Sequence, residues 1–160
     1  MHLLLLIALC LVGTIALLGI ILTVGLRFKI GFVLGAARRM NRRFLNPRQM
    51  ASAGQPDAYA AIVRHAGRTS GALYETPVVA EPTANGFAIA LPYGTRADWL
   101  RNVLAAGQAL IVHDGAEHPV TTPTLHVMAD VEHHFPATER TTHRVMGVVD
   151  ALLIVHADQD

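Results

Sequence analysis

The first 26 residues are almost uniformly apolar. Leu3 to Leu26 is an uncharged run of 24 residues, and as a helix it would be about 36 Å long, enough to cross a hydrocarbon core of about 30 Å. A secretory signal would need a basic start, a shorter apolar core and a small-residue cleavage site. Only His2 precedes the run and no convincing cleavage site follows it. The pattern therefore favours a retained transmembrane anchor.

A basic, partly amphipathic stretch follows from Phe32 to Met50, with apolar residues at Phe32, Leu34, Met40, Phe44 and Leu45. Pro47 is expected to break this helix or mark its end. One interpretation is a juxtamembrane helix that lies on lipid headgroups. The other is a helix that folds over the mouth of a pocket. The two are compatible.

After the loop at Gln55 to Asp57, the pattern becomes that of short strands, with hairpin signals at Asn85-Gly86 and Asp114-Gly115. Thr95 is expected to cap a helix that has Asp98 in its first turn and Gly107 after its end. The strands are predicted at Tyr59–His65, Tyr74–Glu81, Phe87–Leu91, Ala109–His113, Glu117–Thr121, Thr124–Glu132 and Ala151–His156, and the helices at Asp98–Ala106 and Ala137–Met146. These elements predict a mainly β (α+β) fold, a small β-barrel with short helices packed outside.

Charge divides the chain into a basic stalk and an acidic head. Seven of the 13 Lys and Arg lie between Arg27 and Arg48, whereas all 12 Asp and Glu lie at Asp57 or later. By the positive-inside rule the C-terminal part is cytoplasmic, and the stalk suits anionic membrane lipids. The acidic head argues against nucleic-acid binding. We therefore expect a single-pass anchor at 1–27, a basic stalk at 28–50 and a barrel domain at 51–160.

Two further features limit the possibilities. Cys10, the only cysteine, lies inside the apolar run, which excludes an intramolecular disulfide and a cysteine metal cluster. About 110 residues can form only a modest core, so dimerisation would add buried surface and a homodimer is a reasonable expectation.

The segment from Gly67 to Gly71 combines two glycines, two hydroxyls and an arginine between two predicted strands. Glycines allow the backbone to turn tightly and approach a ligand, and the N–H groups of such a turn can bind an anion. Arg68 adds a planar donor suited to phosphate. The segment is not a P-loop, because it has no lysine, and Ser70 is not at the spacing of a nucleophile elbow. By itself it is most simply a polar hairpin loop.

A second segment changes that interpretation. Tyr93-Gly94-Thr95 precedes the predicted helix N-terminus, where free N–H groups favour an anion. Trp99 offers a large aromatic face and Asn102 follows one turn later, although Trp99 taken alone is more simply a core anchor. Together, the two segments suggest the walls of a site for a flat, anionic cofactor.

In this order and separation, these segments resemble the deazaflavin-dependent nitroreductase family. The resemblance covers residues 36 to 156 and includes Ala37 to Arg43, Asn46-Pro47, H-x-G-R-x-S-G from His65, Y-x-T-P-V-V from Tyr74, A-L-P-Y-G from Ala90, D-W-L-R-N-V from Asp98, and Val149 to Leu153. It implies a split β-barrel like that of the pyridoxamine-phosphate-oxidase group. It also implies binding of reduced coenzyme F420, a deazaflavin with a phosphate-bearing tail.

The resemblance also implies roles for individual residues. Arg68, Thr69, Ser70 and Gly71 would hold the phosphate and tail, and Pro77 and Val78 would lie under the ring. Tyr93, Gly94 and Thr95 would contact the ring or ribityl chain, and Trp99 and Asn102 would close the far side. The family usually has Arg or Lys where this chain has Thr69, so one positive charge is missing, for which Arg64, Arg101 or the stalk could compensate.

The chemistry implied is hydride transfer from reduced F420 to a small-molecule electron acceptor. Ser70, Tyr74 and Tyr93 are candidate proton donors. The anchor suggests a lipophilic acceptor, such as a quinone or nitroaromatic. Alternatives are a non-catalytic F420- or flavin-binding carrier and an FMN-dependent reductase on the same fold. The nine histidines lack H-E-x-x-H spacing, so we expect no metal site.

Overall fold

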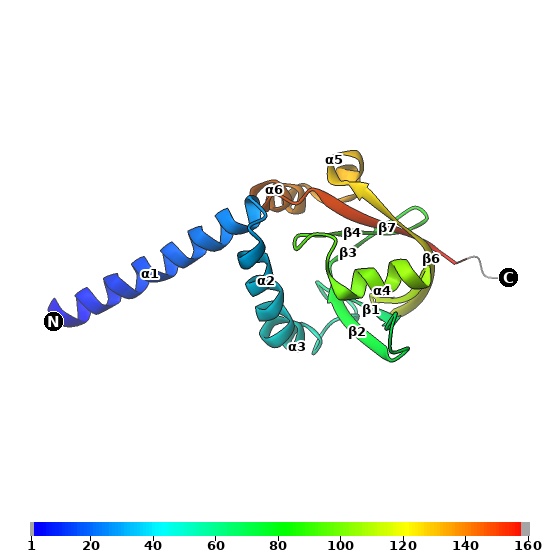
Figure 1. The fold of residues 1–160 in the computed structure, drawn as a ribbon, viewed down its shortest axis with the longest axis horizontal. Helices are drawn as coiled ribbons and strands as arrows, with labels where there is room; N and C mark the ends of the chain where they lie inside the picture. The colour runs from blue at the N-terminus through cyan, green and yellow to red at the C-terminus, as the bar shows by residue number, and fades with distance from the viewer. Residues whose placement is uncertain (1, 158–160) are drawn as a thin grey trace.

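The computed structural model describes residues 2–157. Helix α1 (His2–Arg27) extends away from the rest of the protein (Figure 1). Its most apolar 18-residue window has a mean hydropathy of 3.0, and none of that window is buried by the protein. By length and composition α1 could cross a membrane. Only its C-terminal end packs on the fold, where Leu26 is buried beside Leu34 and Ala37.

The stalk is helical almost throughout. It consists of α2 (Gly31–Met40), the π-helical turn η1 (Asn41–Leu45) and α3 (Asn46–Gln49). Pro47 lies in the first turn of α3, where its missing N–H costs little. The expectation that Pro47 ends the helix is therefore wrong by two residues, since the helix ends at Gln49.

Seven antiparallel strands form one sheet in the order β2-β1-β5-β6-β7-β4-β3. The strands are β1 (Ala61–Ala66), β2 (Leu73–Val78), β3 (Ala80–Thr83), β4 (Gly86–Ala90), β5 (Gln108–His113), β6 (Ala116–Val127) and β7 (Asp150–His156). The helices after the stalk are α4 (Asp98–Ala106), α5 (Met128–Val131), the short 3-10 turn η2 (Glu132–His134) and α6 (Ala137–Met146). The predicted α+β barrel with flanking helices is confirmed.

The prediction of a single strand at Tyr74–Glu81 is wrong. The segment is two strands, β2 and β3, which are the opposite edges of the sheet although only Val79 separates them along the chain. The sheet must therefore curl until its two edges meet at Val79. Pro77 and Pro82 lie in these edge strands, where a residue without an N–H is best tolerated.

The strand predicted at Thr124–Glu132 also differs. It is the second half of β6, which runs continuously from Ala116 to Val127 across a register shift between Thr121 and Thr124. The chain then turns into α5 at Met128 instead of remaining extended. Met128 and Val131 are buried beside Phe135, so this helical turn covers one side of the sheet.

Local signals located the remaining turns well. Asp114 and Gly115 connect β5 to β6 with φ of 52° and 77°, the pattern that a two-residue hairpin turn requires. Helix α4 has its predicted bounds, and Gly107 caps its end with φ of 70°. The predicted cap by Thr95 is wrong, because Ala97 occupies that position and makes no side-chain cap. Leu100 and Val103 of α4 are fully buried in the main core.

Candidate functional site

A cavity of ≈ 1210 Å³ lies between the stalk, β2, the loop before α4, and α6. It brings together most residues that the sequence singled out. Those that line it are Arg68, Thr69, Ser70, Tyr74, Pro77, Val78, Tyr93, Gly94, Trp99 and Asn102. Gly71 and Thr95 do not line it. Gly71 instead shapes the loop, with φ of 67° and an N–H that donates to the carbonyl of Gly67 at 2.8 Å.

Arg68 ties the glycine loop to helix α4. Its Nη1 donates to Oδ1 of Asn102 at 2.8 Å and its Nη2 lies 3.2 Å from Oδ1 of Asp98. Its backbone N–H also donates to Oδ1 of Asn102, at 3.2 Å. The guanidinium therefore has a defined position at the cavity wall before any ligand is present.

Two polar side chains beneath Arg68 are buried, His65 with 5% and Asn102 with 6% of the residue exposed. The amide Nδ2 of Asn102 lies 3.3 Å from Nδ1 of His65, and Nε2 of His65 lies 3.3 Å from Oγ1 of Thr76. Burial lowers the pKa of His65 below its usual 6.5. A neutral imidazole is thus the stable form of His65 at neutral pH.

The three candidate proton donors, Ser70, Tyr74 and Tyr93, lie in two separate parts of the cavity wall. The hydroxyls of Ser70 and Tyr74 lie 3.4 Å apart, and Ser70 also accepts the N–H of Ala72 at 3.3 Å. Tyr93 packs instead beside the buried cluster of Leu26, Leu34 and Ala37, and burial raises its pKa. A higher pKa keeps the Tyr93 hydroxyl protonated, as a donor must be.

The cavity wall is rich in arginine, because Arg38, Arg39 and Arg96 line it together with Arg68. Of the residues expected to compensate for Thr69, the stalk arginines Arg38 and Arg39 therefore lie at the cavity. Arg64 does not line the cavity, and it pairs with Glu75 at 2.7 Å and with Glu117 on the sheet. Arg101 lies outside the cavity, 3.9 Å from Asp98.

A second polar group at the cavity was not predicted. The hydroxyl of Tyr59 donates to Oε1 of Glu139 at 3.1 Å, and Oε2 of Glu139 lies 3.6 Å from Nε2 of His143. All three residues line the cavity. Burial, and then the hydrogen bond to Glu139, raise the pKa of Tyr59. The helical i,i+4 spacing of Glu139 and His143 was the one sequence signal for this group.

The buried histidines predict a dependence of stability on pH. Burial lowers the pKa of both His65 and His143 in the fold. The unfolded chain therefore takes up protons first as pH falls below about 6.5, so their contribution to stability is complete above that pH and is lost below it. We expect thermal unfolding to occur at a lower temperature at pH 5.5 than at pH 7.5.

Glu81 acts in the opposite sense, since burial raises its pKa. The decisive comparison is therefore between the wild type and the double variant His65→Gln/His143→Gln. The acid-induced drop in melting temperature should be smaller in the variant. An equal drop in both proteins would contradict the assignment.

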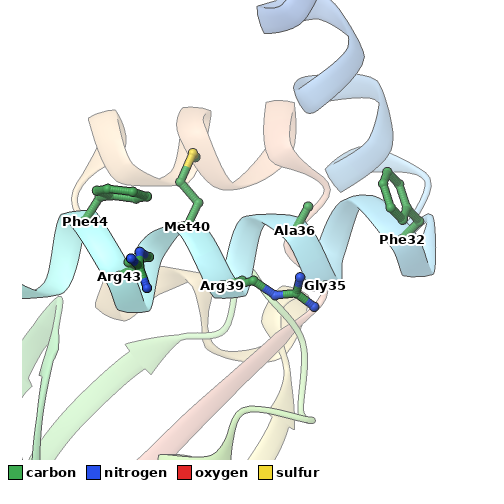
Figure 2. Close-up of a pocket in the computed structure, with 7 residues that line it drawn as sticks. All are labelled: Phe32, Gly35, Ala36, Arg39, Met40, Arg43 and Phe44. Atoms are coloured by element: carbon green, nitrogen blue, oxygen red, sulfur yellow. The ribbon is translucent and has the colours of Figure 1, made fainter.

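The stalk also carries a second, smaller hollow of ≈ 420 Å³, which shares Gly35 and Arg39 with the cavity. Figure 2 shows Phe32, Ala36, Met40 and Phe44 along one side of the stalk helix, with Arg39 and Arg43 beside them. Phe32 is 86% and Phe44 55% exposed. We call Phe32, Met40 and Phe44 the outer stripe.

Histidines also gather at the far end of the sheet, where His113, His118 and His156 surround Phe87 with ring centroids 5.3 to 5.5 Å from it. Within residues 2–157, no group of three or more His, Cys, Asp or Glu side chains is placed as metal ligands would be.

The similarity to known proteins is found among solved structures. No protein-family model matches the chain, and no curated protein matches it. Among solved structures, the chain is similar to an F420-H2 dependent reductase, FDR-A, at 15% identity and a TM-score of 0.48, over 61% of this chain and 93% of that one. It is also similar to a structure named as a domain-swapped dimer, at 14% identity and a TM-score of 0.47, over 76% of this chain and 97% of the other.

Proposed function

We propose that the protein is an F420-dependent oxidoreductase that reduces a lipophilic acceptor, such as a quinone or a nitroaromatic, at a membrane surface. The observation that carries the proposal is the single cavity that joins the glycine loop to the tryptophan-bearing helix. These are the two segments on which the resemblance to deazaflavin-dependent nitroreductases rests.

The residues present fit such a cofactor. Pro77, Val78 and Trp99 offer apolar and aromatic surface for a flat ring, and arginines line the same cavity for an anionic tail. A Cβ at Gly67 would lie 2.6 Å from Oγ of Ser70 and 2.8 Å from the Tyr74 ring, so a larger residue there would displace these two side chains. A volume of ≈ 1210 Å³ exceeds the range typical of one drug-sized ligand, which leaves room for an acceptor.

When bound, reduced F420 supplies the hydride. The protein's part is to hold ring and acceptor in contact, to exclude water and to provide a proton. The Ser70–Tyr74 pair and Tyr93 are candidate donors, since all three residues carry a hydroxyl and line the cavity. The stalk forms one wall, to which Arg38 and Arg39 contribute.

The ligand is tested by titrating the full-length protein, in nanodiscs, with F420, FMN and FAD. We expect the tightest binding for F420, and oxidation of reduced F420 when menadione or a nitroaromatic is added. Binding without turnover of any acceptor would favour a carrier protein. Preference for FMN would favour a flavin enzyme and would contradict the proposal.

We further propose that α1 spans the membrane with the barrel on the cytoplasmic side, and that the outer stripe of the stalk lies on anionic headgroups. The support is the combination on one short segment of exposed aromatic and methionine side chains with arginines, directly after an apolar helix of 26 residues. This arrangement would place the cavity next to the bilayer surface, where a lipophilic acceptor is concentrated.

This location predicts which surface side chains contact lipid. With Cys10 replaced by serine, a spin label on Phe44→Cys should be relaxed by oxygen dissolved in the bilayer more than by a water-soluble nickel complex. A label on Leu73→Cys is the matched control, because Leu73 is 84% exposed at the sheet edge. The label at position 73 should be relaxed more by the nickel complex than by oxygen. Greater access of the nickel complex at position 44 would contradict the proposal.

A further inference from the structure

A chain of four hydrogen-bonded side chains runs from the glycine loop through the interior to strand β2. Its members are Arg68, Asn102, His65 and Thr76, joined at 2.8, 3.3 and 3.3 Å. Its two middle members are at least nine-tenths buried. Such buried polar groups are costly unless they are satisfied, so their orientation is strongly determined by their neighbours.

The direction of every bond in this chain follows from Arg68. A guanidinium has only donors, so the Asn102 atom that faces it must be the carbonyl oxygen. The other end of the Asn102 amide is then an NH₂ donor that faces Nδ1 of His65. Nδ1 must accept, which leaves the imidazole neutral with its hydrogen on Nε2. That hydrogen points to Oγ1 of Thr76, so the Thr76 oxygen accepts.

Thr76 is thereby left with a free hydroxyl hydrogen. Over the part of the chain that the structure describes, no protein acceptor is hydrogen-bonded to it, and Thr76 lines the cavity directly before Pro77. We infer that Thr76 is a positioning residue whose hydroxyl donates a hydrogen bond to a carbonyl oxygen or ring nitrogen of the heteroaromatic ligand. The inference rests on the proposed function for the identity of that ligand.

The bond directions can be tested without ligand. Long-range ¹H–¹⁵N NMR of histidine-labelled protein at pH 7.5 should show His65 neutral, with its hydrogen on Nε2. In Asn102→Asp a carboxylate, which can only accept, faces Nδ1, so the His65 hydrogen should move to Nδ1 or the ring should become charged. A wild-type ring with its hydrogen on Nδ1 would overturn the inference.

The role of Thr76 is tested by binding. We expect Thr76→Val to weaken the binding of oxidised F420 about three- to tenfold, which corresponds to the loss of one neutral hydrogen bond. The substitution should also shift the absorption band of the bound ring. Thr76→Ser keeps the donor and should bind and absorb as the wild type does. Thr83→Val, a half-buried threonine of β3 outside the cavity, is the control and should change neither quantity.

Two failures can be told apart in this experiment. If the wild type does not bind F420, the proposed function is overturned, and the NMR result still decides the bond directions. If the wild type binds F420 and Thr76→Val has the same affinity and the same absorption band, Thr76 is not a donor to the ligand and the inference is overturned.

Discussion

Arg68→Ala is expected to weaken F420 binding about 10- to 100-fold. The guanidinium stands at the cavity wall, fixed by Asn102 at 2.8 Å and Asp98 at 3.2 Å, so it needs no reorganisation to meet an anionic group. A hydrogen bond to a charged group is worth about 1.5–3 kcal/mol, and each 1.4 kcal/mol is a factor of ten in affinity. The variant also releases Asn102, which adds to the loss. Calorimetric titration measures it.

Two controls separate the charge of Arg68 from its geometry. Arg101→Ala removes an arginine from the same helix region but outside the cavity, and should leave affinity unchanged. Arg68→Lys keeps the charge but lacks the planar fork that reaches Asn102 and Asp98 together, so its affinity should fall between the wild type and Arg68→Ala. Unchanged affinity in Arg68→Ala would remove this residue from the binding site.

The sequence located those parts of the site that depend on local signals. Helix α4 could be predicted because its apolar positions and the capping Gly107 lie close together along the chain. The β5–β6 hairpin could be predicted because Asp and Gly both tolerate the positive φ that Asp114 and Gly115 adopt. The glycine loop and Trp99 were each ambiguous alone. Their order along the chain suggested that they form one site, and the structure places both at one cavity, an arrangement that depends on strand order.

The features that sequence reasoning missed depend on contacts between distant residues. Tyr59 and Glu139 are 80 positions apart, so their contact depends on how the whole sheet places α6. The break between β2 and β3 at Val79 is also determined by distant contacts, and no glycine marks it in the sequence. It joins the two edges of the sheet, and these are edges because β1 pairs with β5 and β4 pairs with β7. The two prolines in that stretch were the available hint, since proline is confined to edge strands.

The sequence did not decide whether the stalk lies on lipid headgroups or covers a pocket, because that choice also depends on contacts between distant residues. The stalk's hydrophobic positions predicted an amphipathic helix, and the structure uses two of its faces. Arg38 lines the cavity, whereas Phe32 and Phe44 are exposed on a neighbouring face of the helix. The π-helical turn at Asn41–Leu45 widens the helix just before Pro47, so the angular position of Phe44 relative to Phe32 could not be read from a 3.6-residue period.

Gly86→Ala is expected to lower the free energy of unfolding by more than about 3 kcal/mol, the range of changes that disrupt core packing. A Cβ at Gly86 would lie 2.0 Å from the carbonyl oxygen of Ile154 and 2.7 Å from Cα of Val155. Both are backbone atoms of the neighbouring strand β7, which cannot rotate aside as a side chain could. The strands β4 and β7 would have to separate at this end of their ladder.

The consequence extends to the cavity, because β4 leads directly into the wall formed by Ala90, Leu91 and Tyr93. Denaturation followed by circular dichroism measures the stability, and F420 titration measures the site. Gly31→Ala is the matched control, since a Cβ there meets nothing within 4 Å and alanine suits the start of α2. A Gly86→Ala protein as stable as Gly31→Ala would mean that β4 and β7 are not packed this closely, and the closure of the barrel at Val79 would then need another explanation.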